Sequence, residues 1–322
     1  MGDDMSKYRY QLPQLSDRLF LTDGGMETTF IFLDGLELPY FAAFDLMKTP
    51  GGVAHVRRYY EPYIKLAKQR GLGFILETPT WRASRDWAEK MGYSAQQLID
   101  VNRRSIELLM RLRAEHETPR TPMVVSGAIG PRGDGYAPDK MMTAEEARAY
   151  HAEQIGAFAD SGADLATAFT LNYVEEAIGI ACAAKAARLP VVISFTVETD
   201  GKLPTGQSLR DAIEAVDAAS GRAPAYYMVN CAHPRHFQDT LAAGEPWTGR
   251  LRGIRANAST RSHAELDQAK DLDAGDPAEL GRLYAGLRRK FPNLTVLGGC
   301  CGTDHRHVAQ ICFACAAVEK AA

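Results

Sequence analysis

Short apolar runs recur along this chain, and each ends in a cluster of glycine, proline, aspartate or threonine. Runs of this length that stop at turn-forming residues are typical of buried β-strands. The pattern predicts eight strands, over residues 19–23, 73–77, 122–127, 163–169, 190–196, 225–231, 252–257 and 294–299.

The longer segments between these runs carry the alanine, leucine and glutamate content of amphipathic helices. We expect helices over residues 52–69, 95–115, 144–161, 174–188, 209–219, 235–242, 277–290 and 305–319. Strand and helix therefore alternate, which predicts a parallel sheet, and eight repeats favour a closed (β/α)8 TIM barrel over an open sheet. Because no linker interrupts the pattern, we expect a single α/β domain over residues 1–322.

Two loops rich in glycine and proline, at residues 130–139 and 199–206, follow the third and fifth predicted strands. In barrels of this kind the active site is built from the loops at the C-terminal ends of the strands. We therefore expect both loops to contribute to an active site.

Composition and charge narrow the classes of function. Lysine and arginine total 37 and aspartate and glutamate total 40, which gives a net charge of −3 without long blocks of one sign. This balance disfavours nucleic acid and anionic membranes as partners and favours a small molecule. The polar N-terminal segment has no signal-peptide core, and no apolar run approaches the roughly 18 residues of a membrane span. We expect a cytoplasmic enzyme; nothing in the pattern indicates its oligomeric state.

Three of the six cysteines follow predicted strands. Cys231 ends the sixth run, and Cys300 and Cys301 follow the eighth. The first run ends in Asp23 and two glycines, and it lies beside the eighth once a barrel closes. Three thiols without a fourth predict a zinc site with one open position, because catalytic zinc keeps three protein ligands whereas four-thiolate sites are closed. A thiol bound at the open position would be a thiolate and a nucleophile.

Other interpretations of the cysteines remain open. Cys231, Cys300 and Cys301 are also compatible with buried packing, or the last two with a strained disulfide. A non-catalytic zinc or thiol-redox protein would be expected to show a fourth ligand or a reversible disulfide, and a zinc hydrolase would use histidine and carboxylate ligands. Cys312 and Cys315 lie on one face of an alanine-rich helix, which favours core packing over a second site.

The order of these motifs resembles that of the zinc-dependent homocysteine S-methyltransferases. Asp-Gly-Gly lies near the N-terminus, Asn230-Cys231 in the later middle, and Gly-Gly-Cys-Cys-Gly-Thr at residues 298–303. The resemblance covers almost the whole chain and implies a (β/α)8 barrel with zinc on Cys231, Cys300 and Cys301. It implies transfer of a methyl group from a cationic donor, S-methylmethionine or S-adenosylmethionine foremost, to a zinc-bound thiolate, so that homocysteine becomes methionine. No catalytic side chain is implied beyond that activated thiolate. The residues expected to bind substrate are Asp23, Gly24, Gly25, Thr80, Phe169, Thr170 and Asn230.

Phe169 departs from the family pattern, which has a glutamate at this place to hold the substrate amino group. An ammonium that faces phenylalanine gains at most about 0.5 to 2 kcal/mol, which does not replace a buried carboxylate. Either the acceptor is a different thiol, or Glu27, Glu77 or Glu198 supplies the missing charge. We expect Phe169→Glu to improve the use of homocysteine relative to thiols without an amino group.

Aromatic and histidine side chains complete the candidates. Trp81 is a candidate ring for a cationic donor, whereas packing is the simpler interpretation of the other two tryptophans, Trp87 and Trp247. Three histidines lie next to the cysteine motifs and are as consistent with loop or helix-start positions as with donor contacts: His233, His305 and His307.

Overall fold

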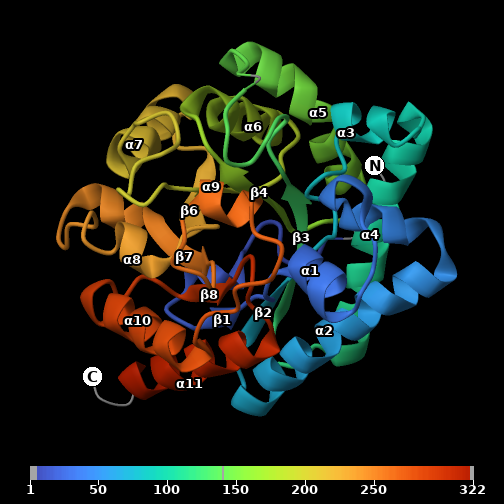
Figure 1. The fold of residues 1–322 in the computed structure, drawn as a ribbon. Helices are drawn as coiled ribbons and strands as arrows, with labels where there is room; N and C mark the ends of the chain where they lie inside the picture. The colour runs from blue at the N-terminus through green and yellow to red at the C-terminus, as the bar shows by residue number, and fades with distance from the viewer. Residues whose placement is uncertain (1–5, 140, 320–322) are drawn as a thin grey trace.

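Eight parallel strands close into a barrel in the order of the sequence, which confirms the predicted (β/α)8 fold (Figure 1). The computed structural model describes residues 6–139 and 141–319, so the prediction of one domain over 1–322 also covers a few residues that lie outside the described ones. The strands are β1 (Phe20–Leu21), β2 (Gly73–Glu77), β3 (Met123–Ile129), β4 (Leu165–Leu171), β5 (Val191–Phe195), β6 (Pro224–Asn230), β7 (Leu251–Ala256) and β8 (Val296–Gly299).

Helices surround the barrel and also cross its mouth, as Figure 1 shows. The helices that follow successive strands and pack around the barrel are α2 (Pro50–Arg70), α4 (Ala95–His116), α5 (Ala144–Asp160), α6 (Val174–Ala186), α7 (Leu209–Ser220), α8 (Pro234–Phe237), α10 (Pro277–Lys290) and α11 (His305–Glu319). Three short helices lie in loops that follow strands: α1 (Met26–Thr28), α3 (Arg85–Lys90) and α9 (His263–Asp267). No helix in the described part of the chain is both long and apolar enough to cross a membrane.

Local sequence accounts for where several helices begin and end. The side chain of Ser94 accepts a hydrogen bond from the Gln97 backbone N–H, and the Gln97 side chain accepts one from the Ser94 backbone N–H, which forms a capping box before α4. Thr143 does the same before α5. Helix α2 ends at Gly71, whose φ of 64° is the left-handed conformation that glycine adopts at low cost.

The barrel is closed at its N-terminal end. Large apolar side chains fill its interior there, and Leu12, from the segment before β1, packs against them. Closure is completed where Phe20 and Leu21 of β1 pair with Val296 and Leu297 of β8. Because this end is packed, the C-terminal ends of the strands are the end at which a ligand can enter.

Two predicted elements are much shorter than expected. The first strand is assigned only to Phe20–Leu21, because beyond Leu21 the chain bonds to β8 alone: Thr22 N donates to Leu297 O, and Gly299 N donates to Asp23 O. The helix expected over 235–242 ends at Phe237. There the Thr240 hydroxyl donates to Phe237 O at 2.8 Å, which offers this carbonyl a partner outside a regular helix.

Candidate active site

A cavity of about 430 Å³ opens at the C-terminal end of the barrel. Its lining includes residues at or just after the ends of β1, β2, β4, β6, β7 and β8. The motifs that the sequence places far apart, at Asp23, Cys231 and Cys300, therefore meet here as expected. Loop 130–139 contributes Asp134, Gly135 and Tyr136 to the lining. Loop 199–206 contributes none of the lining residues, so the expectation for that loop was wrong.

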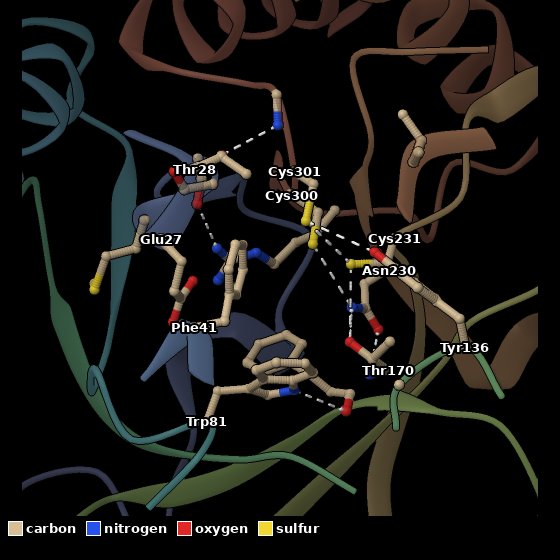
Figure 2. Close-up of a pocket in the computed structure, with 18 of the residues that line it drawn as sticks. Glu27, Thr28, Phe41, Trp81, Tyr136, Thr170, Asn230, Cys231, Cys300 and Cys301 are labelled. Atoms are coloured by element: carbon tan, nitrogen blue, oxygen red, sulfur yellow. Dashed lines mark hydrogen bonds between the residues drawn. The ribbon is translucent and has the colours of Figure 1, made fainter. Parts of the chain in front are cut away.

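The three cysteines point at one place in this cavity (Figure 2). The sulfur atoms of Cys231, Cys300 and Cys301 all lie within 4.8 Å of one another, and Sγ of Cys231 is 3.9 Å from Sγ of Cys301. All three are free thiols. A group of this size and composition can hold a metal ion. Cys312 and Cys315 are fully buried in α11 and belong to the core, as predicted.

Neighbouring strands fix the cysteine backbones. The N–H of Cys231 donates to Arg255 O in β7, and the N–H of Cys300 donates to Ala256 O. Cys231 has a φ of 54°, a left-handed conformation that is unfavourable for a residue with a side chain. The backbone turn that this conformation makes at the end of β6 directs the thiol into the mouth.

Asn230 and Thr170 form a hydrogen-bonded support beside the thiols. Asn230 Oδ1 accepts from the Thr170 N–H at 2.8 Å, and Asn230 Nδ2 donates to the Thr170 hydroxyl at 2.9 Å. Thr170 also has a left-handed φ, of 59°. Asn230 Nδ2 and the Thr170 hydroxyl each lie 3.8 Å from a cysteine sulfur, of Cys300 and Cys231 respectively. The pair thus sets the position of two thiols.

The two glycines after Asp23 allow β1 to approach the loop that holds Cys300 and Cys301. A Cβ atom on Gly25 would lie 2.5 Å from Cys300 O, and one on Gly24 would lie 2.8 Å from Thr303 O. Distances under 3.0 Å to backbone atoms require the backbone to move. Both glycines line the cavity, and their structural role is to permit this close packing.

Hydrogen bonds among the three thiols change their pKa values in opposite directions. Hydrogen bonds from Cys300 and Cys301 lower the pKa of Cys231, because they stabilise its thiolate. The hydrogen bond to Cys231 raises the pKa of Cys300 to about 12, and the same cause raises that of Cys301. One of the three is therefore the favoured thiolate, and a bound cation is needed to hold all three as anions.

Two buried carboxylates, Asp23 and Glu77, differ in their partners. Asp23 is fully buried, lies 2.8 Å from a guanidinium nitrogen of Arg255 and accepts a hydrogen bond from the Tyr59 hydroxyl. Glu77 is 4% exposed and accepts a hydrogen bond from the Thr167 hydroxyl at 3.2 Å. Burial raises the pKa of Glu77 to about 7. Among the described residues, none donates a hydrogen bond to its other oxygen.

Glu27 and Glu198 occupy different places. Glu27 lines the cavity, and burial is the largest of the causes that raise its pKa to about 7, with the nearby Cys300 also raising it. Glu198 bonds instead to His263 Nδ1 at 2.9 Å and does not line the cavity. Of the three predicted substitutes for a carboxylate at position 169, Glu27 and Glu77 thus remain.

Aromatic rings face the thiols across the cavity. Figure 2 shows Glu27, Phe41 and Trp81 on the side of the view away from Cys231, and all three line the cavity. Trp81 Nε1 donates to Phe169 O at 3.4 Å, and Phe169 also lines the cavity. Phe41 has a left-handed φ of 63°, the conformation in which its segment brings it to the mouth.

Several other candidates lie away from the cavity. The Thr80 hydroxyl donates to Ala128 O at 2.7 Å and is buried, while its neighbour Thr78 lines the cavity. Trp87 stacks on the guanidinium of Arg82, and Trp247 is buried within η5 (Pro246–Arg250), so both serve packing. The three histidines near the cysteine motifs are outside the lining: His233, His305 and His307.

Three residues of the cavity were not predicted as site residues from the sequence: Arg255, Tyr136 and Phe41. Arg255 was assigned to a strand without a function, although a charged residue near the C-terminal end of a barrel strand is a signal for a site. Tyr136 was inside a predicted active-site loop; its hydroxyl lies 3.8 Å from Cys301 Sγ, and its ring stacks on His263 at 4.0 Å. Nothing in the local pattern distinguishes Phe41.

The closed barrel and the three converging thiols, which could hold a metal ion, are features of a barrel enzyme. Residues 20–315 match the homocysteine S-methyltransferase family, so the chain belongs to this family and is a methyltransferase.

Solved structures of a bacterial enzyme have the same fold. The oxidized form of the homocysteine methyltransferase MmuM from Escherichia coli is 21% identical, with a TM-score of 0.71 over 94% of this chain and 97% of that chain. Its metallated form is also 21% identical, with a TM-score of 0.67 over 92% and 96% of the two chains. At this identity the likeness shows the shared fold.

Proposed function

We propose that this protein is a zinc-dependent S-methyltransferase that moves a methyl group from a cationic donor to a thiol, with homocysteine as the acceptor that its family indicates. The observation that carries the proposal is the convergence of Cys231, Cys300 and Cys301 on one point of the barrel mouth. Membership of the homocysteine S-methyltransferase family supports the same reaction. A cytoplasmic location is part of this proposal.

The residues present suit zinc. Three cysteine sulfurs are a preferred donor set for this ion, and a site with three protein ligands keeps one position for a reacting group. Cys231, Cys300 and Cys301 would hold the ion, which when bound would keep the acceptor sulfur as a thiolate at neutral pH. This matters because a free thiol, with a pKa of about 8.5, is only a few per cent ionised at pH 7.

The chain supplies binding and orientation for the transfer. A new bond forms between the acceptor sulfur and the methyl carbon while the bond from that carbon to the donor heteroatom breaks. The electron pair of the broken bond stays on the donor, which leaves as a neutral thioether or amine, and the acceptor thiol releases its proton. Asn230 and Thr170 hold the cysteine side of the cavity in place for this in-line attack.

Rings and a carboxylate on the opposite side suit a cationic donor. Phe41 and Trp81 line the cavity with Glu27, and aromatic faces attract a sulfonium or ammonium group. The Trp81 ring also carries the guanidinium of Arg82, at 4.2 Å from its centroid, so the donor would use the rest of this wall. Such a wall also keeps water from the reacting atoms. We therefore favour S-methylmethionine or S-adenosylmethionine as donor, as expected from the sequence.

Metal analysis of protein purified without chelator tests the proposal. We expect about one zinc per chain, and we expect Cys301→Ala to lose most of it while the barrel stays folded. Cys182→Ala, a free cysteine in α6 outside the cavity, is the matched control and should keep its metal. Full retention of zinc in Cys301→Ala would rule out the assignment.

X-ray absorption spectroscopy then tests the open position. The zinc of the isolated protein should have three sulfur neighbours, and addition of the acceptor thiol should increase them to four. Four sulfur neighbours before any thiol is added would instead indicate a closed structural site.

A further inference from the structure

Arg255 is a buried cation inside the candidate active site. It is 7% exposed, it belongs to β7 between the two strands that carry the cysteines, and it lines the cavity. Its Nε donates to Gly299 O at 3.0 Å, and that carbonyl belongs to the residue just before Cys300. The guanidinium therefore lies next to the place where an acceptor thiol would bind.

Two carbonyl acceptors and one carboxylate hold the guanidinium in one orientation. Besides Gly299 O, its Nη2 donates to Gly24 O at 3.0 Å and lies 2.8 Å from Asp23 Oδ1. The ring of Phe169 covers it, with 5.0 Å between the Cζ atom and the ring centroid. Within the described residues, no hydrogen bond uses Nη1 and this atom is not among the buried polar atoms without a partner. This nitrogen is therefore the part of the guanidinium that is left for a ligand.

We propose that Arg255 is a specificity-determining residue that binds the carboxylate of the thiol acceptor. The inference rests on the proposed function and names its acceptor class: a mercapto acid, recognised through its sulfur and its carboxylate, in which an amino group is not required. Homocysteine is one member of this class, and its analogue without the amino group, 4-mercaptobutyrate, is another.

The alternative, recognition of an ammonium at the same place, conflicts with the contacts. Asp23 already forms an ion pair with Arg255 and accepts a hydrogen bond from Tyr59, so its negative charge is balanced within the protein and does not attract a ligand ammonium. An ammonium beside these groups would meet the fixed positive charge of Arg255 and the apolar ring of Phe169. A carboxylate at the same point would meet a donor that is rigid, permanently charged and already freed from most of its water.

The remaining carboxylates do not provide an equivalent site for an amino group. Glu77 is nearly closed off from solvent, and its free oxygen is buried. Glu27 lines the cavity on the side away from Cys231, where it suits the cationic donor (Figure 2).

Three thiols with the same spacing between the sulfur and the carbon that bears the polar groups test the proposal on the zinc-loaded protein: homocysteine, 4-mercaptobutyrate, and 3-aminopropane-1-thiol, which lacks the carboxylate. We expect 4-mercaptobutyrate to reach a kcat/KM within about threefold of homocysteine, and 3-aminopropane-1-thiol to be about ten- to a hundredfold poorer, the range for loss of one hydrogen bond to a charged group. If 3-aminopropane-1-thiol has the same kcat/KM as homocysteine and 4-mercaptobutyrate is not methylated, the protein recognises the amino group of the acceptor through a carboxylate. The proposal is then wrong.

The variant Arg255→Gln should remove the discrimination. The advantage of 4-mercaptobutyrate over 3-aminopropane-1-thiol should fall by about ten- to a hundredfold, chiefly through KM. The matched control is Arg252→Gln, at the other end of the same strand, where the side chain bonds to Gln14 O, Ser16 O and Thr295. This control should keep the preference of the unmodified protein.

A second variant guards against a folding defect. Arg255→Gln leaves Asp23 buried without its partner, so Asp23→Asn combined with Arg255→Gln removes both charges together. If this variant folds, keeps its zinc and still prefers 4-mercaptobutyrate, Arg255 does not read the carboxylate. If the unmodified protein methylates none of the three thiols, the proposed function is wrong. If it methylates homocysteine and 3-aminopropane-1-thiol but not 4-mercaptobutyrate, the proposed function stands and only the inference about Arg255 is wrong.

Discussion

Single side chains at the barrel mouth carry charges that burial makes costly. Glu77 is the clearest case, because it is 4% exposed and burial raises its pKa to about 7, from 4.5. Between these two values the folded protein binds more protons than the unfolded chain, so stability falls as pH rises through this window. A site that tolerates such a cost contains groups selected for a ligand rather than for stability alone.

We therefore expect Glu77→Gln to stabilise the metal-free protein at pH 8 by about 1 to 3 kcal/mol more than at pH 5. Glutamine keeps the shape and can still accept from the Thr167 hydroxyl, but it carries no charge. Chemical denaturation at the two pH values measures the difference. The exposed residue Glu37 provides the control, and Glu37→Gln should show no such pH dependence. An equal effect of Glu77→Gln at both pH values would contradict the expectation.

The substitution Phe169→Glu would change the charge next to Arg255. A carboxylate at this position would lie close to the guanidinium of Arg255, which is now 5.0 Å from the ring of Phe169. It would compete with the acceptor carboxylate for Arg255 and would attract an amino group. The ratio of homocysteine to 4-mercaptobutyrate turnover should therefore rise, by about tenfold for one charge-assisted hydrogen bond. Initial rates with both thiols measure it, and an unchanged ratio would show that position 169 does not affect acceptor choice.

At the scale of elements, the site depends on how closely β1 and β8 approach each other. The loop after β8 carries two adjacent cysteines, and the glycines after β1 leave room for its backbone. The ends of β4 and β6 each place one residue with a side chain, Thr170 and Cys231, in the left-handed region. These strand ends are strained or crowded because they bring thiols from two strands to one point.

Gly25→Ala should weaken metal binding. Its new Cβ atom would lie 2.5 Å from Cys300 O, and overpacking of this kind costs about 1 to 3 kcal/mol, or up to about a hundredfold in affinity. Competition with a chromophoric chelator measures the zinc affinity. Gly51→Ala is the matched control, because no heavy atom lies within 4 Å of its added Cβ atom. Equal affinity in the two variants would show that the loop can shift without loss.

At the scale of the molecule, the packed core of the barrel lies away from the three thiols, so we expect the fold not to depend on a bound metal. The packed interior lies at the N-terminal end of the strands, and the ladder closes through β1 and β8 below the cysteines. The thiols follow the strands and contribute little to this core.

Removal of zinc by a chelator should leave the far-ultraviolet circular dichroism unchanged. The free energy of unfolding should fall only by the contribution of zinc binding, which is about 2.7 kcal/mol when free zinc is a hundred times its Kd. The midpoint of thermal unfolding should fall accordingly. Thermal scans over a series of free zinc concentrations measure this. Loss of the secondary structure on chelation would instead make the site a structural one.

Much of this architecture could be predicted from local pattern. The strand over 73–77 and the helices over 277–290 and 305–319 have the predicted bounds, because apolar runs with clear turn residues at their ends determine both length and type. The helix over 235–242 was too long because a threonine side chain competes for a helical carbonyl. The three metal-ligand candidates could be found from cysteine placement at strand ends, whereas their mutual distances could not.

By itself, the sequence determined the eightfold alternation of strand and helix, and with it the barrel and the end of the barrel where chemistry takes place. Periodicity and turn residues are local signals, and they suffice for these features. Only the tertiary structure decided which charges meet inside the mouth. It pairs Arg255 with Asp23 and covers the pair with Phe169, and it sends Glu198 to His263 instead. These residues are far apart in sequence, and the energy of a buried charge depends on every group that surrounds it in space, which no local pattern contains.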